Sequence, residues 1–438
     1  MTPALFVLAL LSGSLTAPDF AAAVPEVQAL LSDSPEWNAW AARQDDFDYA
    51  AQWPEAPVWP VVEPWRHGPC ADDAQLPEAP ADAAAWQARR AQLAKWVQFW
   101  ITGRTPPAPA NIEAEVLAES EELNATRRLV RLRFGPNQAA QFRVELFIPA
   151  GDGPHPVFIT QHNHRQWGMI ALRRGYLTCV YSGSDSQDDT ASFAEAYPEY
   201  DMAKLVRRAW AASRVIDYLE DAVPQADLEK IGITGHSRNG KTALMAAAFD
   251  PRFRAVISSS SGAGGALPAR LYNERTFGEG IELITRRFPD WFHPRWRFFS
   301  GRPEQLPVDL HHLIALIAPR ACLFATALND NVESTWGIER TYHALRPVWG
   351  LYDATDQLRI DYRAHGHETH PAVIERYLDW CDRAFDRGDY AFPEQLFHPH
   401  EAPASSAAAT PPAADSPNNE YGYEPRHIEQ LLGRASAG

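Results

Sequence analysis

One short segment places a serine where it could act as a nucleophile. Residues 231–241 read IGITGHSRNGK, an apolar run that leads directly into Gly235, His236 and Ser237 and is followed by helix-forming residues. A serine in a sharp turn between a strand and a helix holds its hydroxyl above the edge of the sheet. The helix N-terminus and nearby N–H groups can receive a developing oxyanion there. We interpret Ser237 as the nucleophile of an α/β-type serine hydrolase, although the second glycine of the usual G-x-S-x-G pattern is displaced to Gly240.

A nucleophilic serine needs a base, and three histidines cluster late in the chain, within the run RAHGHETH. They follow a predicted strand at residues 358–362 and precede a predicted helix at 371–385, which is where a loop histidine can reach the serine. We choose His367 as the base, with His365 as the alternative. His370 precedes a proline at the start of the helix and is more typical of a surface residue. The segment offers no further acid or cysteine at zinc-ligand spacing, so we expect no metal.

The orienting carboxylate is expected between the serine and the histidine in the chain order of α/β hydrolases. Asp330 follows the apolar strand predicted at residues 320–327 and is the first candidate. Glu333 is the alternative, about one helical turn further on. A structural role for Asp330, as a loop or N-cap residue ahead of a helix that begins near Ser334, stays open at this point.

The elements around these residues alternate between strand and helix patterns. Helical spacing of apolar residues predicts a helix over 82–103, and later helices at 202–219, 241–249 and 371–385. Strand patterns fall at residues 112–117, 127–134, 141–148, 155–161, 177–181, 231–234, 255–259, 320–327 and 358–362. This alternation predicts a mostly parallel central sheet between two helical layers, the three-layer α/β-hydrolase sandwich, with the first strands as an antiparallel edge.

Composition limits the partners and the domain organisation. The net charge of −16 argues against nucleic acid or an anionic membrane as the main partner. The short apolar stretch at residues 4–11 predicts a signal peptide within residues 1–20, and hence a periplasmic or secreted protein. We expect an irregular extension at 21–81, the catalytic domain at 82–398, and an Ala/Pro/Ser-rich, largely disordered tail at 399–438. The four cysteines form no CxxC pair; Cys179 and Cys322 are expected to be buried thiols, and a disulfide is possible if the protein is exported.

With these segments in view, residues 82–385 resemble the glucuronoyl esterases, carbohydrate esterase family 15, in their bacterial branch. The resemblance rests on the runs GHSRNGK (235–241), SGAGG (261–265), GE (278–279), FPDWF (288–292) and LPVDLHHLIALIAPR (306–320). It implies hydrolysis, through an acyl-enzyme, of esters between lignin alcohols and the 4-O-methylglucuronate branches of xylan. It implies no cofactor.

The resemblance also implies roles for individual residues. Ser237 would be the nucleophile and His367 the base. Arg238 would stabilise the oxyanion, which suits a fixed positive group beside the nucleophile. Lys241 would hydrogen-bond the uronate hydroxyls, and Glu279 would bind the sugar.

Two positions depart from the family pattern. Many members carry their acid as a glutamate where this chain has Ser260, so the acid is expected elsewhere, and Asp330 aligns with a carboxylate of several bacterial relatives. A sugar-stacking tryptophan is often found where Val332 stands, and Trp336 is a possible substitute. Two further polar runs, QHNHRQW (161–167) and GSDSQDDT (183–190), follow strands at the same sheet edge and are expected near the site.

The sequence therefore predicts an exported serine esterase that acts on a polysaccharide or oligosaccharide ester, most specifically on glucuronate esters of xylan. Acetyl xylan or another carbohydrate ester is the alternative substrate, and a peptidase-like hydrolase the alternative activity. A catalytically silent binding protein of the same fold is the rival from outside the enzymes. The oligomeric state stays open.

Overall fold

The computed structural model describes residues 80–271, 279–297, 299, 303, 306, 308–328, 330, 332–364 and 366–398. The predicted signal peptide and C-terminal tail lie outside these residues, as does the N-terminal extension apart from Pro80 and Ala81. None of the helices among the described residues is both long and apolar enough to span a membrane.

A nine-stranded sheet forms the centre of the described part, in the order β1-β2-β3-β5-β4-β8-β9-β10-β11. The first pairs, up to β3 with β5, are antiparallel, and every pair from β5 onward is parallel. The strands span β1 Glu113–Glu122, β2 Ala125–Phe134, β3 Ala140–Pro149, β4 His155–Gln161, β5 Leu177–Tyr181, β8 Ala226–His236, β9 Ala255–Ser259, β10 Ala321–Ala327 and β11 Leu358–Arg363. The short strands β6 Gly183–Ser184 and β7 Gln187–Asp188 form a separate hairpin.

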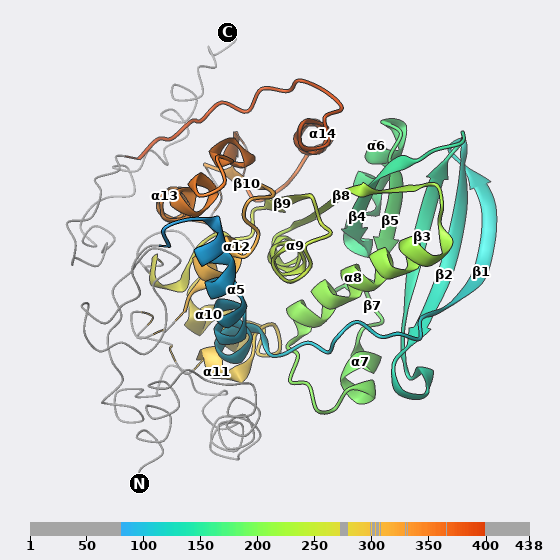
Figure 1. Cartoon of the computed structure of the whole chain (residues 1–438), viewed down its shortest axis with the longest axis horizontal. Helices are drawn as coiled ribbons and strands as arrows, with labels where there is room; N and C mark the ends of the chain where they lie inside the picture. Colours follow the sequence, from blue (N-terminus) through green and yellow to red (C-terminus); the bar gives the residue numbers. More distant parts are fainter. Residues whose placement is uncertain are drawn as a thin grey trace.

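Helices cover both faces of this sheet (Figure 1). One layer contains α5 Ala83–Val97, α8 Lys204–Ala222, α9 Arg238–Phe249, α12 Leu310–Ala315 and α13 Thr335–Gly350. The other contains α6 Arg165–Arg173 and α14 Pro371–Ala384. Three shorter helices complete the described part, namely α7 Ala191–Ala196, α10 Ile281–Arg287 and α11 Pro294–Arg297.

Alternation along the central strands explains the two layers. In β10, Cys322 and Phe324 pack with the α8–α9 layer, whereas Leu323 and Ala325 pack with α6 and α14. Successive strand residues point to opposite faces, so a fully apolar strand can be buried on both sides. The predicted three-layer arrangement with an antiparallel leading edge is confirmed.

Local sequence signals account for most element boundaries. Asp82 caps α5 by accepting from the Ala85 N–H at 2.8 Å, and the helical turns after α5 end at Gly103, whose φ of 78° favours glycine. The structure adds α6 at Arg165–Arg173, for which no helix was predicted. Cys179, Cys322 and Cys381 are buried free thiols, as predicted for the first two, and Cys70 lies outside the described residues.

Candidate active site

Ser237 occupies a strained turn between β8 and α9. Its φ of 56° and ψ of −125° lie outside the regions that most residues adopt. The backbone N–H of Ser237 donates to the Ser259 carbonyl at 2.8 Å, which ties the turn to the end of β9. Strain of this kind is typical of a nucleophile turn, which exposes the hydroxyl above the sheet.

The displaced glycine follows from how closely α9 approaches the sheet. A Cβ atom on Gly240 would lie 2.9 Å from the Ser259 carbonyl oxygen, and one on Gly235 only 2.3 Å from the Asn239 carbonyl oxygen. Asn239, which takes the usual glycine position, is buried, and its Nδ2 lies 3.1 Å from Nε2 of His164. The steric demand for glycine therefore falls at residue 240 in this chain.

His367 and Asp330 are brought together from two loops at the carboxyl edge of the sheet. Nδ1 of His367 lies 2.8 Å from Oδ2 of Asp330. The Asp330 side chain is completely buried, whereas that of His367 is 34% exposed. His365, the alternative base, lies outside the described residues.

The surroundings of Asp330 keep it ionised. Burial by itself would raise the pKa of Asp330, but the hydrogen bond and charge of His367 and the N–H of Val332, 2.9 Å from Oδ1, bring that pKa below its ordinary value. Arg363 lies 3.8 Å from Oδ2 of Asp330 and also donates to the hydroxyl of Ser260. Ser260, which stands where many family members have a glutamate, thus helps to hold the Arg363 guanidinium beside Asp330.

Glu333, the alternative acid, is buried and bonded elsewhere. Its Oε1 accepts from the Gly262 N–H at 3.0 Å, and its Oε2 accepts from the Thr326 hydroxyl at 2.6 Å. Burial, and then the neighbouring Asp330 charge, raise the pKa of Glu333. Glu333 therefore links the loop after β9 to strand β10 through these two hydrogen bonds.

The sequence did not predict that His236, the residue before Ser237, would pack against His367. Its ring centroid lies 4.5 Å from that of His367, and its Nδ1 lies 3.0 Å from the Ser259 hydroxyl, which also accepts from Tyr377. The backbone N–H of His236 donates to Nε2 of His164 at 3.2 Å. Burial, and then the charges of His367 and other neighbours, lower the pKa of His236 to about 2, so it stays neutral. A histidine beside Ser237 was visible in the sequence, but nothing local showed which ring it would face.

Three other predicted residues surround the nucleophile turn. Arg238 forms an ion pair with Asp185, and its guanidinium carbon lies 4.8 Å from the ring centroid of Trp291. Lys241 is buried, donates to the Ser261 carbonyl at 2.5 Å and lies 3.8 Å from Oε2 of Glu279. Burial lowers the pKa of Lys241, and the Glu279 charge opposes that effect.

Trp336, the proposed substitute for a stacking residue, lies in the first turn of α13. It is only 8% exposed and belongs to the large core cluster on the α8–α9 side of the sheet. The guanidinium carbon of Arg340 lies 5.3 Å from its ring centroid. A ring so buried offers little surface for a sugar.

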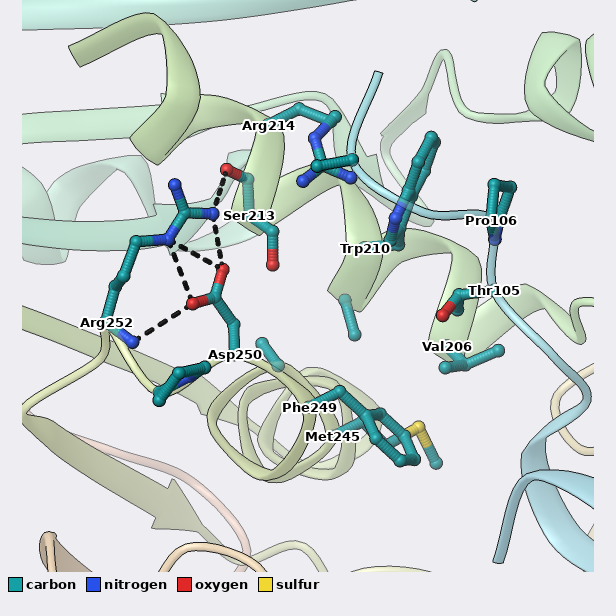
Figure 2. A pocket seen from close by; sticks show the side chains of 14 residues that line it. Thr105, Pro106, Val206, Trp210, Ser213, Arg214, Met245, Phe249, Asp250 and Arg252 are labelled. Atoms are coloured by element: carbon teal, nitrogen blue, oxygen red, sulfur yellow. Dashed lines mark hydrogen bonds and ion pairs between the residues drawn. The ribbon is translucent and has the colours of Figure 1, made fainter. Parts of the chain in front are cut away.

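A separate cavity of about 220 Å³ lies between α8, α9 and the segment after α5 (Figure 2). It is lined by the C-terminal half of α9, whereas Ser237 precedes the first residue of that helix. Arg252 and Asp250 form an ion pair at its edge, at 2.7 Å. The candidate site residues are not among those that line it.

Known proteins with a similar sequence include several glucuronoyl esterases. A family model described as "Glucuronyl esterase, fungi" matches residues 135–352. The 4-O-methyl-glucuronoyl methylesterase 1 of Wolfiporia cocos is 30% identical over 310 residues, which cover 66% of this chain and 73% of the relative. The 4-O-methyl-glucuronoyl methylesterase of Podospora anserina is 28% identical over 66% of this chain, which spans only 60% of that relative's length.

Solved structures show the same fold. A carbohydrate esterase family 15 glucuronoyl esterase from Caldicellulosiruptor kristjansonii superposes with a TM-score of 0.65 at 24% identity, over 81% of this chain and 97% of that one. Its nearly full coverage shows that the central sheet and its helical layers are shared. The chain therefore belongs to the glucuronoyl esterase family, carbohydrate esterase family 15, and has the α/β-hydrolase fold.

Proposed function

We propose that this protein is a serine carboxylic ester hydrolase that acts on glucuronate esters of xylan. The observation that carries the proposal is the 2.8 Å contact between Nδ1 of His367 and the buried Asp330 carboxylate. The imidazole of His367 packs against His236, which precedes the strained Ser237. A buried carboxylate on Nδ1 selects the tautomer in which Nε2 is free to accept a proton. Membership of the glucuronoyl esterase family supports the substrate class.

The reaction proceeds in two acyl transfers. The Ser237 hydroxyl attacks the ester carbonyl carbon while His367 takes the proton, and the oxyanion forms beside Arg238. Collapse of this intermediate breaks the bond to the alcohol, which leaves with the proton from His367. Water then attacks the acyl-enzyme, again with His367 as the base, and releases the free uronic acid and the Ser237 hydroxyl.

The uronate preference rests on groups around the first turn of α9. Lys241 lies one helical turn after the nucleophile, with Glu279 3.8 Å away, so a buried donor and an acceptor stand side by side. Sugar hydroxyls are recognised by such paired donors and acceptors. In this proposal Lys241 and Glu279 bind the hydroxyls, and the buried Trp336 does not stack on the sugar.

Hydrolysis of benzyl glucuronate, measured beside p-nitrophenyl acetate, tests the proposal. Wild type should turn over the glucuronate ester, and Ser237→Ala should abolish that activity. Activity on the acetyl ester alone would instead indicate an acetyl xylan or other carbohydrate esterase. Inactivity on both esters, without labelling by a fluorophosphonate, would indicate a binding protein of the same fold.

We also propose that the protein is exported and that residues 82–398 form its catalytic domain. The apolar stretch at residues 4–11 supports a signal peptide, and a polysaccharide substrate lies outside the cell. Expression in a bacterial host followed by fractionation and N-terminal sequencing tests this. A protein that stays in the cytoplasm with residues 1–20 uncleaved would contradict it.

A further inference from the structure

The segment 183–190, whose polar residues the proposed reaction leaves without a role, touches the nucleophile turn through Asp185. This residue lies in the turn between β6 and β7. One of its carboxylate oxygens pairs with Nη1 of Arg238, and the other lies 2.9 Å from Nη1 of Arg208. Asp185 thus bridges two arginines from two different helices, α9 and α8.

The second arginine is a rigid anchor. Arg208 lies within the 19-residue helix α8, and its side chain is almost completely buried. Its Nε and Nη2 each lie 2.8 Å from Oδ2 of Asp188. A buried guanidinium is costly to leave without carboxylate partners, so Arg208 holds Asp185 and Asp188 in place.

Aromatic rings support Arg238 as well. The rings of Phe288 and Trp291 are stacked, with centroids 3.8 Å apart and planes 4° from parallel. The Arg238 guanidinium carbon lies 5.2 Å from the first centroid and 4.8 Å from the second. Arg238 therefore has two kinds of support, a π-surface and the Asp185 carboxylate.

The pairing also balances charge around the nucleophile. Arg238 faces Asp185, and Lys241 faces Glu279, so each candidate binding cation has a carboxylate partner. A neutral ester therefore meets no net electrostatic repulsion in such a site. The product is a free carboxylate, which Arg238 would retain if its charge were not paired. The negative charge of Asp185 repels this product.

We propose that Asp185 is a positioning residue that fixes Arg238 for oxyanion binding and weakens retention of the uronate product. This inference rests on the proposed role of Arg238. It assigns to the β6–β7 turn a part in both the acylation step and product release.

Asp185→Asn tests the proposal because the amide keeps the shape and removes the charge. We expect kcat to fall about tenfold on both benzyl glucuronate and p-nitrophenyl acetate, with KM nearly unchanged, because only the transition state uses the fixed arginine. The inhibition constant for free glucuronate should fall severalfold. Asp185→Glu, which restores the charge, should recover the inhibition constant and part of kcat.

Asp189→Asn is the matched control. It removes a carboxylate from the same segment, one that pairs with Arg143 at 2.7 Å. Its inhibition constant for glucuronate should equal that of wild type. In an Arg238→Met background, Asp185→Asn should add little further loss.

Two results would overturn the proposal: kcat and the inhibition constant of Asp185→Asn within twofold of wild type, or equal changes in Asp189→Asn. Failure of the proposed function is distinguishable, since wild type would then not hydrolyse benzyl glucuronate. The kcat on p-nitrophenyl acetate would still test whether Asp185 positions Arg238, because any acyl transfer forms the oxyanion.

Discussion

At the scale of single residues, the site depends on a buried carboxylate whose position in the chain differs from the common family pattern. Ser260 stands where many family members have a glutamate, and its hydroxyl accepts from Arg363. In the proposed mechanism Asp330 supplies the carboxylate instead, from the next loop along the sheet. The sequence predicted the pairing of Asp330 with His367 because both residues follow parallel strands, whose carboxyl ends share one edge.

The two acidic candidates can be separated by isosteric amides. Asp330→Asn should lower kcat on benzyl glucuronate roughly 10³–10⁴-fold, because the amide places a donor against Nδ1 and favours the wrong tautomer. Glu333→Gln should cost less than about tenfold, since its carbonyl can still accept from the Gly262 N–H. Steady-state kinetics of both variants decide the matter, and the reverse order of effects would make Glu333 the acid.

Lys241 tests substrate recognition separately from chemistry. Lys241→Met fills the buried space but removes the charged donor, so kcat/KM on benzyl glucuronate should fall about 10–100-fold. Turnover of p-nitrophenyl acetate, which has no sugar hydroxyls, should change less than about threefold and serves as the internal control. Equal losses on both esters would show that Lys241 supports the fold of the turn rather than the sugar.

At the scale of elements, the patterned strands were predictable and the polar segments between them were not. Strands β4, β5 and β9 begin and end at the predicted residues because their apolar runs are bounded by clear breaks. Helix α6 was missed although Trp167, Met169 and Leu172 give it a buried apolar face, and the β6–β7 hairpin was missed because each of its strands has only two residues. Long-range contacts place those segments, through bonds such as that from the His236 N–H to His164.

The close approach of α9 to β9 gives a stability prediction at this scale. Gly240→Ala should destabilise the protein by about 1–3 kcal/mol, because its Cβ would lie 2.9 Å from a backbone oxygen that cannot easily move. Gly350→Ala, at the end of α13, meets only an ordinary contact at 3.8 Å and should be neutral or slightly stabilising. Urea unfolding measures both, and equal effects would show that helix packing tolerates the added methyl group.

At the scale of the whole molecule, buried histidines couple stability to pH. Burial lowers the pKa of His164 and His293 to about 4 and of His236 to about 2, from 6.5. The unfolded chain therefore binds protons at these sites first as the pH falls. Stability is fully present above pH 6.5 and decreases below it, by up to about 1.4 kcal/mol per pH unit for each histidine.

Urea unfolding at pH 7.5, 6.5 and 5.5 should therefore show a falling free energy of unfolding. His164→Gln, which retains an acceptor for the His236 N–H, should show a shallower decrease. A free energy that is flat across this range would mean that these rings are protonated in the folded protein.

The central claim for the molecule as a whole is that a uronic acid becomes covalently attached to Ser237. The most direct measurement is an acid quench of wild type during turnover of benzyl glucuronate, followed by peptide mass spectrometry. The account predicts a glucuronoyl ester on the peptide that contains Ser237, and no hydrolysis by Ser237→Ala. Hydrolysis of benzyl glucuronate that persists in Ser237→Ala would contradict it.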